Sequence, residues 1–364
     1  MENNKTIVLT GGGSAGHVTP NIALIPSLKK EGFNIHYIGT ERGIERSLVE
    51  PIEGVEYHAI SAGKLRRYFS FKNFSDPFRV IKGASQAKKL IKRLNPDVVF
   101  SKGGFVSVPV VMAAKGRCPV VCHESDYTPG LANKIAARYA DTECVTFEDT
   151  LKYTGKTHAV HTGTPIRRDL FEGDRRRGLD FLGFSGERPV ILVMGGSLGA
   201  NALNDAVRGA LCEITKRFDV IHLCGKGKLD GSIASPNYRQ YEFISKELPD
   251  LMAATDIVIS RSGANSVFEF LALKKPAIFV PLPLEASRGD QILNAEYCEK
   301  KGYSAVMQQK DVNAESLTAK INELYDSRQS FIDRMDTDET LDGTKKVLDI
   351  ILKAAETGLE KRKK

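Results

Sequence analysis

Two glycine-rich segments of the chain have the composition of loops that hold phosphate groups. Gly11–Gly16 (GGGSAG) follows the apolar run Ile7–Thr10, and Gly195–Gly199 (GGSLG) follows Val190–Met194. Glycine has no Cβ, so the backbone N–H groups of such a loop can approach a ligand closely. The helix predicted after each loop turns its positive end toward an anion. This repetition predicts two similar domains that face each other across a cleft.

His17 follows the first loop at the predicted start of a helix. A helix N-terminus tends to keep an imidazole neutral, so the ring can accept a proton, and a positioned base contributes about 10²–10⁴-fold in rate. A histidine that only hydrogen-bonds to the loop fits the pattern equally well. Gly11, Gly13 and Gly16 also satisfy the dinucleotide fingerprint, with Glu41 near the end of the second strand. A nicotinamide or flavin enzyme is therefore an alternative, which the duplicated loop and His17 disfavour.

Further polar residues of the first half follow predicted strands. Gly103 and Gly104 form a glycine turn after one strand, and His123-Glu124-Ser125-Asp126 follows the next. The carboxyl ends of parallel strands are where such sheets bind ligands. We expect Glu124 and Asp126 to act in acid–base catalysis or to bind substrate by hydrogen bonds. The alternative is that Ser125 or Asp126 caps the next helix.

The second half has a comparable polar segment. Arg261–Glu269 opens a helix after a strand, so the N–H groups around Ala264, Asn265 and Ser266 could hold a diphosphate, and Glu269 could bind ribose hydroxyls. A simple capping box formed by Ser266 and Glu269 is the alternative. A second polar group could recognise a sugar or only start a helix: Asp290, Gln291 and Asn294.

Length and composition favour a two-domain soluble protein. The chain has 364 residues, with 41% hydrophobic and 27% charged. It has no apolar run long enough for a transmembrane helix, and the N-terminus leads directly into a strand, so we expect no signal peptide. The six scattered cysteines indicate reduced thiols in a cytoplasmic protein. The net charge of +7 suits an anionic partner.

Strands alternate with helices, which predicts an α/β fold with parallel sheets. Helices are expected at 20–31, at 76–94, at Ala264–Ala272 and at Leu341–Leu359, the last of which could cross back to the first domain. The expected strands are Ile7–Thr10, Asn34–Ile38, Asp97–Ser101, Val120–His123, Glu143–Thr146, His158–Gly163, a strand from Val190, Val220–Leu223, Tyr241–Ile244, Ile257–Ser260 and Ala277–Val280.

One segment mixes aromatic and basic side chains, a combination that suits a membrane interface. Single-stranded nucleic acid would bind a similar surface, and a face that is half core and half solvated is the simplest alternative. The residues are Leu65, Phe69, Phe71, Phe74 and Phe78, interleaved with Lys64, Arg66, Arg67 and Lys72.

In order and spacing, these motifs resemble the MurG family of peptidoglycan glycosyltransferases over essentially the whole chain. The resemblance rests on Gly12–His17, Gly103–Ser107, His123–Glu124, Thr162–Arg167, Gly195–Ala200, Arg261–Ala264 and Asp290–Ala295. It implies the GT-B fold, with two Rossmann-like parallel-sheet domains facing across a cleft. It also implies transfer of N-acetylglucosamine from UDP-N-acetylglucosamine to the muramyl 4-hydroxyl of lipid I (undecaprenyl-pyrophosphoryl-N-acetylmuramyl-pentapeptide). The product is lipid II with an inverted, β-1,4 linkage, and no metal or other cofactor is required.

The resemblance also implies residue roles. His17 is the expected base, with Glu124 or Asp126 as second choice. Asp126 stands where the family often has Asn, and Lys102 is not the residue expected before Gly103. The residues expected around the donor are Arg167, Ser197, Ile244, Ala264, Glu269 and Gln291, approached by Ser14, Ala15 and Gly16.

The implied organisation has an acceptor and membrane-docking domain at 1–164, joined by a helix at 343–364, and a donor domain at 165–342. Docking through the segment 64–82 would place the protein peripherally on the cytoplasmic face of a bacterial plasma membrane, with no nucleic acid partner. A UDP-N-acetylglucosamine epimerase or another GT-B sugar transferase is the alternative in the same fold. A nicotinamide oxidoreductase and a non-catalytic binding module are the others.

Overall fold

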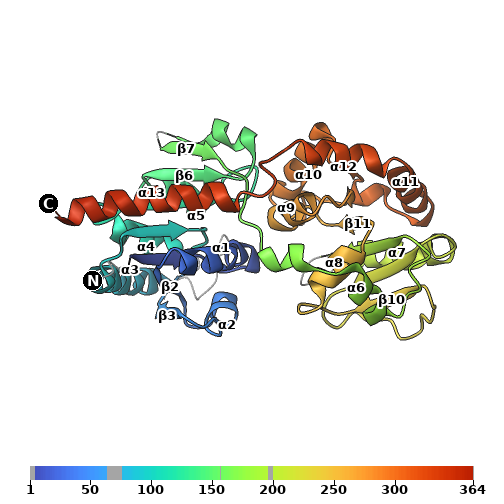
Figure 1. Ribbon diagram of the computed structural model, residues 1–364, viewed down its shortest axis with the longest axis horizontal. Coiled ribbons are helices and arrows are strands. Elements are labelled where there is room, and N and C mark those ends of the chain that lie inside the picture. The colour runs from blue at the N-terminus through green and yellow to red at the C-terminus, as the bar shows by residue number, and fades with distance from the viewer. Residues whose placement is uncertain (1–4, 64–75, 156, 196–199, 364) are drawn as a thin grey trace. The chain divides into compact units, whose positions relative to one another are not determined.

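The computed structural model describes residues 5–63, 76–155, 157–195 and 200–363 of the chain. The chain divides into two compact units, each built around its own sheet (Figure 1). The first domain comprises Met1–Arg167 and Asp342–Lys364, and the second comprises Arg168–Leu341. Within the described residues, no helix combines the length and the apolar character needed to cross a bilayer.

The first domain alternates strands and helices along the chain. Its strands are β1 (Thr6–Thr10), β2 (Asn34–Thr40), β3 (Val55–Ile60), β4 (Val98–Ser101), β5 (Val120–Glu124), β6 (Thr142–Val145) and β7 (His158–His161). Its helices are α1 (Thr19–Lys30), α2 (Ile44–Val49), α3 (Asp76–Leu94), α4 (Ser107–Ala114), α5 (Leu131–Ala137) and α13 (Thr344–Lys363), with the 3-10 turns η1 (Ala15–His17) and η3 (Glu148–Tyr153).

All described strand pairs of the first sheet are parallel, in the order β3-β2-β1-β4-β5-β6-β7. The central strand β1 is buried on both faces: Ile7 and Leu9 pack into one core, and Val8 into the other. This burial explains why the sequence of β1 is continuously apolar rather than alternating. Helices α1 and α13 contribute to the core on the first face, and α3 and α4 to the core on the second.

The last helix, α13, returns to the first domain. Val347, Ile351 and Ala355 follow one another at a spacing of four residues, and all three are fully buried in the core that contains β1. Thr344 at the start of α13 accepts a hydrogen bond from the backbone N–H of Ile166 through its Oγ1, at 2.9 Å. The helix is therefore part of the first domain's fold.

The second domain repeats this architecture. Its strands are β8 (Val190–Met194), β9 (Asp219–Leu223), β10 (Tyr238–Tyr241), β11 (Ile257–Ser260), β12 (Ala277–Phe279) and β13 (Ser304–Val306). Its helices are α6 (Arg175–Leu182), α7 (Asn201–Ile214), α8 (Leu248–Ala254), α9 (Ala264–Ala272), α10 (Asp290–Lys301), α11 (Ala314–Asp326) and α12 (Arg328–Asp336), with η4 (Arg168–Glu172) and η5 (Gln309–Asp311).

The second sheet has the order β10-β9-β8-β11-β12-β13 among the described residues, again entirely parallel. The expected strand Tyr241–Ile244 is wrong in position, because β10 ends at Tyr241. Its neighbour β9 ends at Leu223, and the N–H of Cys224 donates to the carbonyl of Tyr241 at 2.9 Å. Beyond that hydrogen bond β10 has no strand to pair with, so Ile244 lies after the strand.

In each sheet the chain order reverses beside the first strand. The reversal lies between β1 and β4 in the first domain and between β8 and β11 in the second. In open α/β sheets, ligands bind outside the carboxyl ends of strands at such a switch point. Both glycine-rich segments follow the first strand of their sheet, so each begins at a switch point. The predicted α/β fold with two Rossmann-like parallel-sheet domains is confirmed.

Candidate active site

The two glycine turns of the first domain pack backbone against backbone. The N–H of Gly12, after β1, donates to the carbonyl of Gly103, after β4, at 3.3 Å. Gly104 has a φ of +83°, and a Cβ at this position would lie 2.1 Å from the Gly12 carbonyl oxygen. Any side chain at Gly104 would therefore force the two turns apart.

A buried carboxylate supports the first turn from within the domain. Glu45 on α2 accepts hydrogen bonds from the N–H of Gly13 at 3.2 Å and from the N–H of Thr40 at 2.9 Å. A Cβ on Gly12 would lie 2.6 Å from the carboxyl carbon of Glu45. The N–H groups of Gly12 and Gly13 are thus both used inside the protein, beside a negative charge. Among the predicted contacts, Ser14, Ala15 and Gly16 are the part of the loop that could meet a phosphate.

His17 ends the short turn η1, and its Nδ1 lies 3.2 Å from the carbonyl oxygen of Lys102. A carbonyl oxygen can only accept, so Nδ1 carries the proton, and in the neutral ring Nε2 is the basic nitrogen. The long helix α1 begins two residues later, at Thr19, with Pro20 in its first turn. In a dinucleotide site the helix starts within the glycine loop, and its N–H groups hold the pyrophosphate. The geometry after β1 does not have that form.

Lys102 is fully buried behind the second turn. Its ammonium group contacts the hydroxyl of Ser125. Burial lowers the pKa of Lys102 to about 8, while the nearby carboxylates of Glu124 and Asp126 act in the opposite direction. A buried cation thus faces the two acidic residues predicted from the sequence, and its backbone carbonyl orients His17.

Glu124 has a structural task in addition to any chemical one. Its carboxylate accepts hydrogen bonds from the N–H of Asp126 at 2.9 Å, the N–H of Gly130 at 3.1 Å and the side-chain amide of Asn133 at 2.8 Å. Burial and the charge of Asp126 raise the pKa of Glu124. These bonds close the loop between β5 and α5. Helix capping by Asp126 or Ser125 is ruled out, because Gly130 is the N-cap of α5.

In the second domain, α9 presents polar side chains at the switch point. The helix begins at Ala264 with Gly263 as N-cap and no side-chain cap, so the capping box of Ser266 and Glu269 is not formed. Asn265, Ser266 and Glu269 are half-buried. The helix buries its other side in the core through Val267, Phe268, Phe270 and Leu271. Its N-terminal turn therefore has the polarity expected of a diphosphate and ribose site.

Helix α10 is tied to the same loop. Asn294 is buried and its amide donates to the carbonyl of Ser262 at 3.0 Å, and the Ser262 hydroxyl donates to the carbonyl of Gln291 at 2.7 Å. Gln291 accepts the N–H of Leu282 through its Oε1 at 3.0 Å. Asn294 thus holds the α9 and α10 termini together. Ile244 is also buried.

Several predicted site residues have no structural description. Ser197 lies outside the described residues, as does most of the aromatic–basic segment. Phe78 belongs to α3, but its side chain is not described. The segment residues outside the description are Lys64, Leu65, Arg66, Arg67, Phe69, Phe71, Lys72 and Phe74.

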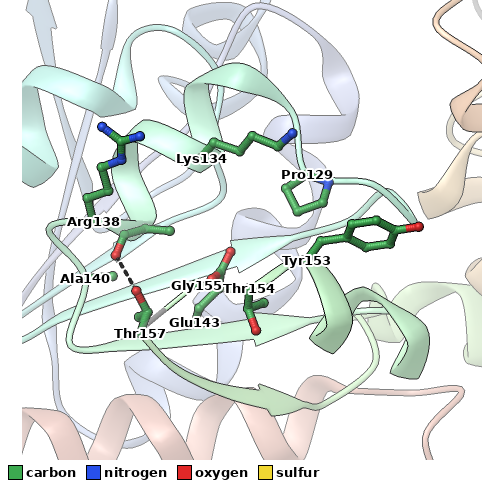
Figure 2. A pocket seen from close by; sticks show the side chains of 10 residues that line it. Pro129, Lys134, Arg138, Ala140, Glu143, Tyr153, Thr154, Gly155 and Thr157 are labelled. Atoms are coloured by element: carbon green, nitrogen blue, oxygen red, sulfur yellow. Dashed lines mark hydrogen bonds between the residues drawn. The ribbon is translucent and has the colours of Figure 1, made fainter.

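A cavity of about 550 Å³ lies beside α5, and no residue of the two glycine turns lines it (Figure 2). Its lining includes Lys134, Arg138, Glu143 and Tyr153, and none of the predicted catalytic residues. Glu143 on β6 is 2% exposed, and one of its carboxylate oxygens has no hydrogen-bond partner. Burial raises the pKa of Glu143 to about 7, with a smaller contribution from Glu124. No sequence motif marks Glu45, because its partner Gly13 lies 32 residues away in the chain.

Comparison with known proteins adds to this geometry. The model of the glycosyltransferase family 28 N-terminal domain matches residues 7–145, and that of the C-terminal domain matches residues 190–351. The chain belongs to glycosyltransferase family 28. The first match lies within the first domain, and the second covers the sheet of the second domain and the start of α13. Both glycine-rich segments lie within the matched ranges.

Curated relatives in this family match almost end to end. One from Lachnoclostridium phytofermentans is 56% identical over 349 residues, which is 95% of this chain and 98% of the relative. One from Clostridium botulinum strain Langeland is 52% identical over 351 residues, covering 96% and 99%. Both relatives are named UDP-N-acetylglucosamine–N-acetylmuramyl-(pentapeptide) pyrophosphoryl-undecaprenol N-acetylglucosamine transferase.

Solved structures agree on the fold. The crystal structure of Acinetobacter baumannii MurG is 25% identical with a TM-score of 0.72, covering 96% of this chain and 99% of that one. A glycosyltransferase of kitacinnamycin is 16% identical with a TM-score of 0.74, covering 97% and 99%. The second likeness concerns the fold alone. The family 28 chain is therefore a glycosyltransferase with the GT-B architecture.

The raised pKa of Glu143 predicts a pH-dependent loss of stability. The folded protein holds this proton up to about pH 7, whereas the usual value is 4.5, so the free energy of unfolding falls as pH rises between these values. The variant Glu143→Gln lacks this term. We expect its stability relative to the wild type to increase from pH 4.5 to about 7 and then to level off, as measured by urea denaturation. A pH-independent difference, equal to that of the exposed variant Glu148→Gln, would contradict the assignment.

Proposed function

We infer that this family 28 enzyme transfers N-acetylglucosamine from UDP-N-acetylglucosamine to lipid I, giving lipid II in peptidoglycan synthesis. One observation carries this inference: curated relatives with that transferase name are 52% to 56% identical over 95% to 96% of the chain. The fold alone would not decide, because other sugar transferases share it. The reaction needs a base and groups that bind the diphosphate, and polar residues suited to these roles follow strands at both switch points.

In the proposed reaction, the 4-hydroxyl of the muramyl sugar attacks the anomeric carbon of N-acetylglucosamine. A bond forms from the hydroxyl oxygen to that carbon, the bond from the carbon to the diphosphate oxygen breaks, and UDP leaves. Attack from the opposite face converts the α-linked donor into a β-1,4 product. The hydroxyl proton passes to a base on the protein.

His17 is the proposed base. Its Nδ1 donates to the carbonyl of Lys102, which fixes the ring orientation and leaves Nε2 as the nitrogen that takes a proton. Glu124 is less suited, because its carboxylate already accepts three hydrogen bonds within the loop that follows β5. Asp126 stays as the second candidate, with the buried charge of Lys102 nearby.

The second domain is the proposed donor domain. The uncapped N-terminal turn of α9 would meet the negative charge that grows on the diphosphate, and Glu269 would bind the ribose hydroxyls. The proposed donor site also includes Ala264, Asn265, Ser266 and Gln291. The family resemblance adds Arg167, Ser197 and Ile244. Ser14, Ala15 and Gly16 are assigned to the same substrate from the first domain. The transfer is proposed to need no metal.

A nicotinamide-dependent enzyme is not favoured. The N–H groups of Gly12 and Gly13 are used inside the first domain, and the buried carboxylate of Glu45 lies against them. A pyrophosphate at this position would meet a negative charge instead of a helix N-terminus.

The proposed location is the cytoplasmic face of the plasma membrane, with peripheral attachment. Lipid I is a membrane-embedded acceptor, and the aromatic–basic segment at 64–82 has the composition of an interfacial anchor. Each cation near an anionic surface adds about 1 kcal/mol of binding free energy.

The variant His17→Gln tests the base. Glutamine can still donate to the Lys102 carbonyl but cannot take the proton, so we expect the transfer rate to fall by about 10²–10⁴-fold. Binding of UDP-N-acetylglucosamine, measured by calorimetry without added metal, should stay within about threefold of the wild type, since His17 is not assigned to the donor. The control is His158→Gln, at an exposed position on β7 of the same domain. Unchanged turnover in His17→Gln would remove this residue from the mechanism.

The double variant Phe71→Ser, Phe74→Ser tests the membrane segment. We expect weaker sedimentation with phosphatidylglycerol vesicles, because the apolar groups that enter the interface are lost. Phe243→Ser is the matched control, since Phe243 is 71% exposed on the second domain. If the double variant binds vesicles fully and the control does not, the docking surface lies on the second domain instead.

A further inference from the structure

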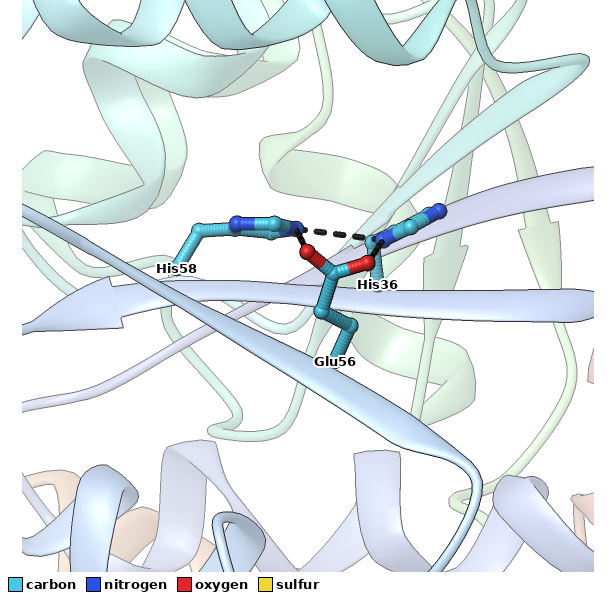
Figure 3. A group of neighbouring side chains, drawn as sticks. All are labelled: His36, Glu56 and His58. Carbon is cyan, nitrogen blue, oxygen red and sulfur yellow. Dashed lines mark hydrogen bonds and ion pairs between the residues drawn. The ribbon is translucent and has the colours of Figure 1, made fainter.

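Two histidines and a glutamate converge on one face of the first sheet (Figure 3). His36 lies on β2 and is in register with Glu56 on β3, and His58 follows two residues after Glu56. Neighbours in register on parallel strands point to the same face, and so do residues two apart on one strand. All three side chains therefore project to one side of the sheet. Within the part of the chain that the structure describes, no other group of histidine, cysteine and acidic side chains converges in this way.

The separations of the possible ligand atoms match a tetrahedral metal site. His36 Nδ1 lies 3.1 Å from His58 Nε2 and 3.2 Å from a carboxylate oxygen of Glu56. The second carboxylate oxygen lies 3.6 Å from His58 Nε2. In a tetrahedral site with bonds of 2.0–2.1 Å, ligand atoms lie about 3.3 Å apart. Each ring lies near a different oxygen of Glu56, so the carboxylate would have to turn to bring one oxygen near both nitrogens, and one atom from each residue already lies within 4.8 Å of the others.

The chemical character of the three groups also favours a metal ion. Imidazole binds a metal through a ring nitrogen that carries no proton, and each ring turns one nitrogen toward the other ring and toward the Glu56 carboxylate. The two ring nitrogens face each other, and a single proton between them accounts for the hydrogen bond. A bound ion would take the place of that proton, which would move to the other nitrogen of the same ring. Arg93, near the end of α3, is the cation that acts on both rings, and the Glu56 carboxylate offsets it.

We propose that His36, Glu56 and His58 form a binding site for a divalent transition metal ion, with zinc as the best match. Imidazole nitrogen with one carboxylate suits zinc, whereas magnesium and calcium prefer oxygen ligands alone. The Glu56 side chain is 63% exposed, so an ion can enter from solvent and a water molecule can complete the coordination.

The site would act on the fold and not on glycosyl transfer. Strand β3 is the edge of the sheet, and its only strand neighbour among the described residues is β2. A shared ion would tie that edge strand in place. His36 and Glu56 lie near the amino ends of their strands, whereas His17 follows the carboxyl end of β1, and Glu124 and Asp126 lie at the carboxyl end of β5. The inference does not depend on the proposed function.

The test is calorimetric titration of zinc into the full chain after removal of metal with a chelator. We expect one ion per chain and a dissociation constant in the micromolar range or below. Glu56→Gln and His36→Leu should each weaken binding at least about tenfold, since the first removes the carboxylate charge and the second removes a ligand nitrogen. Zinc should also raise the melting temperature of the wild type but not of these variants.

Two controls address other zinc ligands. Cys212 is an exposed thiol, and His158 is an exposed histidine on β7, so Cys212→Ser and His158→Ala should leave zinc binding unchanged. Cobalt in place of zinc should give a tetrahedral visible spectrum without a thiolate charge-transfer band. Zinc binding that survives both ligand variants, disappears in Cys212→Ser, or fails at micromolar zinc would overturn the proposal. Glu56→Gln should leave donor binding and glycosyl transfer unchanged. A failure of the zinc proposal can therefore be distinguished from a failure of the proposed function.

Discussion

The close approach of two glycine turns is the constraint on which the first domain's proposed site depends. The hydrogen bond from Gly12 to Gly103 joins the loops after β1 and β4, on the two sides of the switch point. It is possible only because Gly104 has no side chain to meet the Gly12 carbonyl. Glu45 closes the arrangement from inside by accepting the N–H of Gly13. The position of His17 follows from this packing, since its ring is bound to the backbone of the residue before Gly103.

Glycine in this chain therefore has two separate uses. At Gly12, Gly13 and Gly104 it allows backbone packing inside one domain, and the N–H groups of the first two are satisfied within the protein. Anion binding is proposed instead for the residues that follow, and for the N-terminal turn of α9 in the second domain. This division explains how a sequence that satisfies a dinucleotide fingerprint can fold without forming a dinucleotide site.

Sequence patterns predicted the fully buried strands and missed the half-buried edge strand β3. Strands β1 and β8 are continuously apolar because both faces are buried, and the glycine loops that follow them are visible in the sequence. Strand β3 alternates Val55, Tyr57 and Ala59 with polar Glu56 and His58, as an edge strand can, and no prediction was made there. An alternation test at period two would have found it, together with two of the three proposed zinc ligands.

Contacts that join distant parts of the chain could not be predicted in the same way. Glu45 lies 32 residues from Gly13, and nothing in the local sequence indicates that its carboxylate supports the first turn. The Ser266–Glu269 pair is the reverse case, in which a local pattern predicts a contact that does not form. The pair has the spacing of a capping box, but the helix begins at Ala264. The burial of Lys102 beside Glu124 and Asp126 likewise depends on which strands are neighbours in the sheet.

The most direct measurement is glycosyl transfer by the purified chain, supplied with UDP-N-acetylglucosamine and lipid I in the presence of a chelator. The account predicts that lipid II and UDP form in equal amounts, and that nuclear magnetic resonance shows a β linkage at the muramyl 4-position. Consumption of the UDP-sugar by epimerisation, an α-linked product, or no transfer to lipid I would contradict it.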